Sequence, residues 1–517
     1  MKQGKRGVIF VPQHTLSRDW AERLNREAGE DIAAVWYGTE QEDPEASGEQ
    51  MCRYLETADL FLKAGGKMSS FCKGCEFNPK KDQTSGVVCG YQRQRRTDRP
   101  VWILPSNMLE KPGPGAVVPK SPDGSKTHPD FVVIDESPWL GLLGGFSGGA
   151  AELDIVKLLE ARTFPAREGE SREGLALDSE RILDAIHQAI AAHEEAGRIQ
   201  RALVTGSRIS TEDALEMAGR EMRLKEELPV DGPTCRPVGK AQALELLGDV
   251  LKVNSVVVRR RRFWALLGAF LAGEGAEAPG LKLTAPGESR RVQMRWRKDI
   301  HDDWVLSSPV LYLDGTMNAR LARAWLPRLE VGPRIKVEPV AGAVTRRQVT
   351  DWNGSARKLI KSEQAANNRS RLARIVEVRA ASFQGMGPGG VDVLVIGQKE
   401  LINRLRDEHG EKLGPRVEFA WYNNIRGVDR WRDVPYLLMV GRPLPSPRDV
   451  AEMAGVILGR VIPPAAEDGW YPTEPRGLRM AEGRAGVRHP HHPDPDAEAV
   501  RWQICEAELH QAEARAR

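Results

Sequence analysis

The sequence contains no apolar stretch approaching the roughly 20 residues that a membrane-spanning helix needs. It also lacks a secretory leader, because its polar start runs directly into a short strand without an apolar leader region. Charge of one sign is not in excess. The chain has 75 Lys and Arg against 72 Asp and Glu, a net charge of +3, so bulk electrostatics single out no partner. These absences predict a cytoplasmic protein without membrane contact, and its 517 residues allow about two to four domains.

Cysteine is scarce, yet four of the six cysteines fall between residues 52 and 89. In a chain without export signals, such a cluster favours metal ligation over disulfides. Cys72 and Cys75 form a C-x-x-C pair, which offers two thiolates from one turn, and Cys52 and Cys89 flank it. Four sulfurs suit tetrahedral zinc or a four-iron cluster, while four free thiols are the least favoured interpretation. The segment is polar and has little core of its own, so a metal would staple it.

Two adjacent acids follow an apolar run in the first third of the chain. Residues 131–134 predict a strand buried on both faces, and Asp135 and Glu136 stand where it ends. In a parallel α/β sheet, ligands bind just beyond the carboxyl ends of the strands. One carboxylate can hold the magnesium ion of a nucleotide there, while its neighbour orients an attacking water. Taken alone, the pattern also fits a plain strand that ends in acids.

Two further buried strands end in polar residues. Residues 7–12 predict a strand that ends in a turn with Pro12 and His14, before an amphipathic helix at 16–28. Residues 309–313 predict a strand followed by Asp314 and Thr316. Between these regions the chain is expected to be mostly helical. The candidate helices are 178–196, 211–227, 240–253 and 262–272, and an alternating strand follows at 291–296.

The second half predicts another α/β unit. Strands are expected at 334–340, 391–396, 417–420 and 434–440, with a helix at 398–408. Arg426, Gly427 and Asp429 form an Arg-Gly-x-Asp run, whose glycine allows backbone to approach a nucleotide or phosphate closely. A stretch rich in proline, glycine and charge at 463–495 indicates a loop or lid. The final helix carries Gln511, Arg515 and Arg517.

The order and spacing of these features resemble the XPD/DinG-type iron–sulfur helicases of superfamily 2. In that family four cysteines lie between motif Ia, matched here by Pro12 and His14, and the acidic Walker B box, matched by Asp135 and Glu136. The resemblance implies an α/β fold with two RecA-like parallel-sheet lobes, a cysteine-rich insertion and a helical, arch-like insertion. The implied domains are lobe 1 at 1–149 with the cysteine insertion at 50–96, the helical insertion at 150–300, a return to lobe 1 at 301–333 and lobe 2 at 334–517.

The resemblance also implies a role for each motif, with ATP and Mg²⁺ bound between the lobes. The implied catalytic residues are Asp135, Glu136, Gln511, Arg515 and Arg517. The implied nucleotide-binding residues are Asp135, Gly427 and Asp429, and the implied DNA-track or coupling residues are Pro12, His14, Asp314, Thr316 and Arg426. A 4Fe–4S cluster, or Zn²⁺ in its place, would be held by Cys52, Cys72, Cys75 and Cys89. The implied partners are single-stranded or forked DNA, travelled 5′ to 3′, and other domains of a larger replication protein.

The chain departs from the family in three places. No phosphate-binding loop G-x-x-x-x-G-K-[ST] precedes motif Ia, since only seven residues come before Val8. Ser137 and Pro138 replace the usual Ala-His, and Ala514 stands where glycine is usual. We expect a truncated relative, or otherwise a non-hydrolysing one, with weak or no ATPase activity in residues 1–517. The alternative is a non-catalytic, zinc-stapled nucleic-acid-binding protein on a degenerate helicase scaffold.

Overall fold

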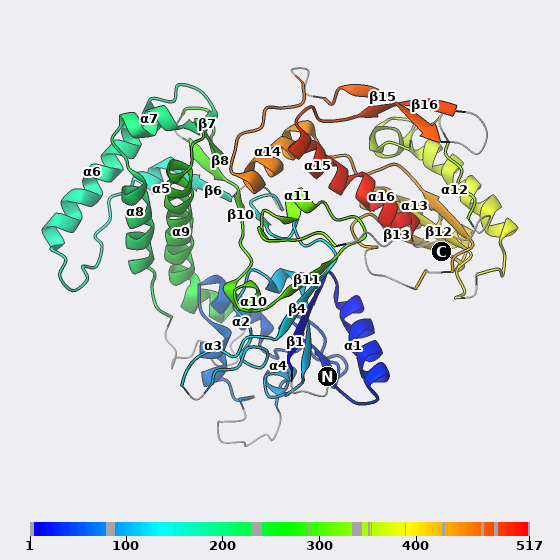
Figure 1. The fold of residues 1–517 in the computed structure, drawn as a ribbon, viewed down its shortest axis with the longest axis horizontal. Coiled ribbons are helices and arrows are strands. Elements are labelled where there is room, and N and C mark those ends of the chain that lie inside the picture. Colours follow the sequence, from blue (N-terminus) through cyan, green and yellow to red (C-terminus); the bar gives the residue numbers. More distant parts are fainter. Residues whose placement is uncertain are drawn as a thin grey trace.

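The computed structural model describes residues 5–78, 88–121, 123–147, 149, 151–228, 240–287, 289–332, 344–349, 352, 354–387, 389–425, 430, 431, 433–466, 470–479 and 484–514. Within these residues it is a mixed α/β structure built on two parallel sheets and a four-stranded antiparallel sheet (Figure 1). The first parallel sheet has the strand order β11-β4-β1-β3-β2. Its strands are β1 (Gly7–Val11), β2 (Ala33–Val35), β3 (Val101–Pro105), β4 (Phe131–Asp135) and β11 (Val310–Leu313).

The predicted strands at 7–12, 131–134 and 309–313 are therefore confirmed, and side chains cover both faces of the sheet at β1 and β4. Alternate residues of β1 point to opposite faces: Ile9 packs against α1 (His14–Ala28), whereas Phe10 meets Trp304 on α10 (Asp302–Val305). Parallel strands buried on both sides read as continuous apolar runs, which is why the sequence revealed them.

Strand β11 forms an edge of this sheet that lacks cover on one face. Leu311 is 55% exposed and Leu313 is 38% exposed. Leu311 pairs in register with Val133, which packs on the α1 side of the sheet, so the exposed leucines lie on that same face. Helix α1 covers the sheet near β1, β2 and β3 and leaves the β11 end of this face open.

The cysteine segment folds as three short helices, α2 (Leu55–Lys63), α3 (Met68–Gly74) and α4 (Gly90–Gln94). Its core residues Phe61 and Phe71 pack with Leu247 of helix α9 (Lys240–Ala272). The side chain of Asn254, also on α9, donates to the Ala64 carbonyl at 2.6 Å. The segment is thus anchored to the neighbouring helical region. A 3₁₀ turn, η1 (Ser106–Met108), follows β3.

Residues 151–297 are less purely helical than expected. Helices α5 (Ile155–Leu159), α6 (Arg172–Ala191), α7 (Arg201–Gly206), α8 (Thr211–Arg223) and α9 surround an antiparallel sheet of order β6-β9-β8-β7. Its strands are β6 (Ala151–Asp154), β7 (Gly197–Gln200), β8 (Glu277–Leu283) and β9 (Arg291–Met294), and β10 (Trp296–Arg297) pairs with β5 (Leu143–Gly144). The alternating strand expected at 291–296 is confirmed in β9. Strands β6 and β7 have only four residues each and β8 contains glycine and proline, so these three show no apolar alternation. The two helices expected at 240–253 and 262–272 are one continuous 33-residue helix.

The second parallel sheet has the order β13-β12-β14. Its elements, in chain order after α11 (Ala319–Ala322), are a π-helical turn η3 (Arg357–Lys361), α12 (Ala365–Ser382), β12 (Val393–Gly397), α13 (Lys399–Leu413), β13 (Val417–Trp421) and β14 (Tyr436–Met439). The strands expected at 391–396, 417–420 and 434–440 are confirmed, and the strand expected at 334–340 lies outside the described residues.

The C-terminal part packs between the two parallel sheets in Figure 1. It consists of α14 (Pro447–Leu458), the hairpin β15 (Thr473–Arg479) and β16 (Arg484–Pro490), α15 (Pro495–Ile504) and α16 (Glu506–Glu513). The hairpin corrects the expected loop at 463–495: proline and glycine punctuate it but do not prevent antiparallel pairing. Among the described helices none has the length and apolarity to span a bilayer.

Candidate functional site

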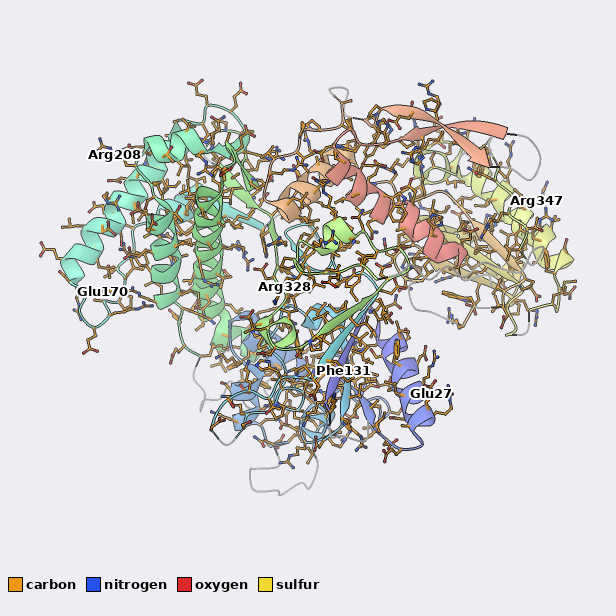
Figure 2. All side chains as sticks on the ribbon, in the orientation of Figure 1. Glu27, Phe131, Glu170, Arg208, Arg328 and Arg347 are labelled. Atoms are coloured by element: carbon orange, nitrogen blue, oxygen red, sulfur yellow. The ribbon has the colours of Figure 1, made fainter. Side chains whose placement is uncertain are left out.

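The two predicted acids stand at the carboxyl end of the first sheet. Figure 2 labels Phe131 at the amino end of β4, and the strand runs from there to Asp135. Glu136 follows with φ of +65°, a left-handed backbone that is uncommon for a residue other than glycine. Its N–H still donates to the Leu313 carbonyl at 2.8 Å, so the turn begins while pairing with β11 continues. Because of this turn, the carboxylates of Asp135 and Glu136 point in different directions.

Asp135 is half-buried and has a specific donor. The indole Nε1 of Trp20, on α1, donates to its Oδ2 at 2.9 Å. Burial raises the pKa of Asp135, the Trp20 hydrogen bond opposes that rise, and the nearby charge of Asp314 adds to it. A carboxylate in these surroundings gains from a cation, because a positive charge would offset both the burial and the repulsion.

Glu136 meets the C-terminal helix. The side-chain amide of Gln511, on α16, donates to Glu136 Oε2 at 3.0 Å across 375 positions of sequence. Three residues earlier on the same helix, Glu508 Oε2 accepts from the backbone N–H of Asn423 at 2.9 Å, just beyond the end of β13. Helix α16 therefore touches the carboxyl ends of both parallel sheets.

The strand β11 motif lies at the same edge. Asp314 Oδ1 accepts from the backbone N–H of Thr316 at 2.7 Å and from its hydroxyl at 2.9 Å. The Thr316 carbonyl accepts a short hydrogen bond from the side chain of Gln503 on α15. Ser137, the residue after the acid pair, shares a 2.7 Å hydrogen bond with the Tyr312 hydroxyl of β11. The polar residues after β4 and β11 thus form one connected patch that the C-terminal helices cover.

Pro12 and His14 follow β1 at this sheet edge too. His14 is the first residue of α1, and its ring stacks on Tyr37 with centroids 6.0 Å apart and an interplanar angle of 7°. Burial lowers the pKa of His14, Arg18 lowers it further, and Glu40 opposes the shift. His14 is therefore a neutral aromatic surface at neutral pH rather than a cation.

All four clustered cysteines are buried and unbridged by disulfides. They come from different elements: Cys52 precedes α2, Cys72 and Cys75 are at the end of α3, and Cys89 is the N-cap of α4. Each of the other three raises the pKa of Cys52, so the four thiols share one neighbourhood. Burial is the largest cause, and it raises the pKa of Cys52 to about 12 and that of Cys75 to about 11.

Polar groups near these sulfurs oppose the effect of burial on their pKa values. The backbone N–H groups of Tyr54, of Phe77, and of Tyr91 with Gln92 lower the pKa values of Cys52, Cys75 and Cys89 respectively, and Gln92 and Arg95 lower that of Cys72. Hydrogen bonds to sulfur stabilise thiolates and tune metal–sulfur centres. Even so, across the described part of the chain no three His, Cys, Asp or Glu side chains are already arranged around a point where a metal ion would sit. Four cysteine sulfurs are a ligand set that suits an iron–sulfur cluster or zinc. In the described residues they lie near one another but do not surround a common metal position.

Several predicted residues cannot be placed. Arg426, Gly427, Asp429, Arg515 and Arg517 lie outside the described residues. Conversely, Trp20, Gln503 and Glu508 belong to the site and escaped the sequence analysis. Trp20 occupies an apolar helical stripe, where the polar edge of an indole gives no pattern, and no motif marks the other two.

Sequence comparison finds no protein-family model and no curated protein that matches this chain.

Proposed function

We propose that this protein is the motor core of an ATP-dependent helicase or translocase that acts on single-stranded or forked DNA. The observation that carries the proposal is the hydrogen bond between Glu136 and Gln511, because it joins the acids of one parallel sheet to a helix that also touches the other. In this proposal the two sheets are the cores of two RecA-like lobes, lobe 1 at 1–149 and 301–333 and lobe 2 at 334–517.

The acids then take complementary roles. Asp135 holds Mg²⁺ with ATP, which relieves its buried and repelled charge, and Glu136 orients the attacking water. Through its hydrogen bond, Gln511 links Glu136 to α16. Arg515 and Arg517 follow that helix in the sequence and supply positive charge to the γ-phosphate. Gly427 and Asp429 complete the nucleotide side, while Pro12, His14, Asp314, Thr316 and Arg426 couple the site to DNA.

The open edge of β11 gives the missing phosphate loop a place. Parallel crossovers are right-handed, so connections that progress in one direction across a sheet put their helices on the same face. Suppose that a further strand lay beyond β11 and that a loop and a helix connected it to β1. This connection would cross the sheet in the same direction as the one that contains α1, which leads from β1 to β2. Its helix would cover the exposed Leu311 and Leu313, and its loop would lie beside Asp135. In this proposal such a unit would strengthen nucleotide binding, while Asp135 and Glu136 already make the DNA affinity of the chain respond to Mg²⁺–ATP.

The cysteines would hold a 4Fe–4S cluster, with Zn²⁺ as the alternative. The fit rests on the burial of the four sulfurs in one neighbourhood and on the nearby polar groups that lower their pKa values, including Arg95, whose positive charge suits an anionic centre. When bound, the metal centre would fix the shape of residues 50–96. Because this segment packs on α9, a rigid insertion would be presented together with the helical region.

A second candidate is a non-catalytic, zinc-stapled nucleic-acid-binding protein. The observation that favours it is the Trp20 hydrogen bond to Asp135, which satisfies the proposed magnesium ligand without a metal.

The test is nucleotide-dependent DNA binding by the purified chain. A labelled single-stranded oligonucleotide is titrated with and without Mg²⁺–ATP, since a motor must bind DNA differently in its nucleotide states. The motor proposal expects the affinity to change with Mg²⁺–ATP in the wild type and not in Asp135→Asn. Asp123→Asn, an exposed acid in a loop, is the matched control. DNA binding that ignores nucleotide in every form would favour the second candidate, and no DNA binding would refute both.

A further inference from the structure

A basic pocket lies where the antiparallel sheet meets the C-terminal part of the chain. Strand β8 and helix α14 are side by side there (Figure 1). Arg198 of β7, Lys282 of β8 and Arg295, which follows β9, line the pocket, and Glu452 of α14 closes it. The proposed motor roles leave these residues unused.

Two of these cations oppose each other directly. Arg198 and Lys282 are register partners in the antiparallel pair β7–β8, so their side chains leave the same face of the sheet at neighbouring positions. Like charges placed this way destabilise a sheet. Both side chains are half-buried, and within the described residues neither has a hydrogen bond or an ion pair. Within the described residues, no hydrogen bond or ion pair to either side chain offsets this repulsion.

A third cation reaches the same place from α14. Burial is the main cause that lowers the pKa of Lys282, and Arg448, Arg198 and Arg295 lower it further. Arg448 is exposed at the second position of α14, where the helix dipole adds positive potential.

Three acids lie near the group. Glu452 pairs with Arg295, and Asp449, which accepts from the Ser446 hydroxyl at 2.7 Å at the start of α14, opposes the burial effect on the pKa of Arg295. Glu277 lies near enough to oppose the burial effect on Arg198. Arg198, Lys282 and Arg448 remain as cations without an ion-paired partner in the described chain.

We propose that Arg198, Lys282 and Arg448 bind a phosphate group of single-stranded nucleic acid at this seam between the antiparallel sheet and α14. The pocket is open to solvent and has room for only one or two water-sized groups, a volume of about 20 Å³, so it takes phosphate oxygens rather than a base or sugar ring. A phosphate would contact both sides of the seam, which makes its binding sensitive to how α14 sits on the sheet. The site positions the backbone and carries no sequence preference. The choice of nucleic acid as the phosphate source rests on the proposed function.

The experiment compares the wild type with the double variant Arg198→Gln/Lys282→Gln. Arg172→Gln is the control, because Arg172 is an exposed arginine at the start of α6 and has no ion pair within the described residues. Binding of a single-stranded oligothymidylate is measured from 50 to 200 mM salt. Each lost phosphate contact lowers the slope of log K against log salt by about 0.7, so the double variant, which loses the one phosphate of this site, should lose about 0.7 and the control nothing.

Thermal unfolding provides a second readout. Without ligand the double variant should melt no lower than the wild type, because it removes two facing like charges. Inorganic phosphate should raise the melting midpoint of the wild type and of the control but not of the double variant. A lower midpoint in the ligand-free variant would show that the cations are structural and would overturn the proposal.

The outcomes separate this site from the motor proposal. An unchanged salt slope in a chain that binds the oligonucleotide overturns the seam site and leaves the motor proposal standing. An unchanged slope together with phosphate protection that the variant loses shows a site for free phosphate and overturns the nucleic-acid assignment. A wild type that binds no oligonucleotide refutes the motor proposal, and the nucleic-acid source fails with it.

Discussion

The contact between Glu136 and Gln511 makes a quantitative prediction about helix α16. A hydrogen bond to a charged group contributes a net of about 1.5–3 kcal/mol, and the pair is only partly buried, so we take about 1.5 kcal/mol. That free energy corresponds to roughly a tenfold change in the equilibrium between the docked and the open helix. Gln511→Ala should therefore increase opening of α16 about tenfold, with the first sheet unaffected.

Native-state hydrogen exchange on the α16 amides measures this opening directly. Glu136 and Gln511 have other interactions, so the informative quantity is the coupling energy from a cycle with Glu136→Ala, Gln511→Ala and the double variant. We expect a coupling of about 1.5 kcal/mol. Gln188→Ala, which removes an exposed amide from α6, should leave α16 protection unchanged. Single effects that add to within about 0.3 kcal/mol would refute a direct contact and remove the main support for the motor proposal.

Three further predictions concern stability and metal content. Glu221→Gln should destabilise the chain by about 3–5 kcal/mol in denaturant unfolding, because it leaves the fully buried Arg260 unpaired, whereas Glu221→Leu with Arg260→Met should be far milder. Hydrogen bonds from Arg416 lower the pKa of Asp392, so the carboxylate stabilises the fold above about pH 4, and this contribution is lost as the pH falls through the lowered pKa. In Asp392→Asn the free energy of unfolding, monitored by circular dichroism, should therefore fall less steeply at acidic pH than in the wild type. Cys72→Ser should reduce the iron or zinc found by elemental analysis after anaerobic purification, with Cys235→Ser as the control, and a metal-free wild type would contradict the metal centre.

Sequence patterns were informative where burial was continuous. β1, β4 and β12 are apolar runs covered on both faces, and such runs admit few alternatives. Alternation revealed β9 of the antiparallel sheet, but the patterns were silent for its other strands. A four-residue strand such as β7, with Gly197 and Arg198, has too few positions to show alternation. Because these strands are short, the sequence also did not show that Arg198 and Lys282 face each other. Their pairing depends on the register of β7 and β8, which only the structure gives.

The candidate site divides in the same way. Asp135 and Glu136 could be predicted because a strand end concentrates polar groups at one sheet edge. The meeting of Glu136 with Gln511 followed only from motif order in a resembled family, since no local property links residues so far apart. Trp20 could not be found at all, because its helical periodicity is that of a core residue while its indole N–H serves the acid.

The C-terminal helices offer a physical route between the acid site and the basic pocket. Helix α14 faces the pocket, and α15 and α16 contact the first sheet through Gln503 and Gln511. Arg460, just after α14, donates to Asp494 at the start of α15 at 2.8 Å, and it also pairs with Asp496. These charge-assisted bonds make α14 and α15 one mechanical unit. A shift of α16 that accompanies a change at Glu136 would therefore move Arg448 relative to Lys282, because Lys282 belongs to the sheet on the other side of the seam. In the proposed motor, this unit would couple nucleotide binding to nucleic-acid binding without a contact between the two ligands, provided that they favour different positions of α14.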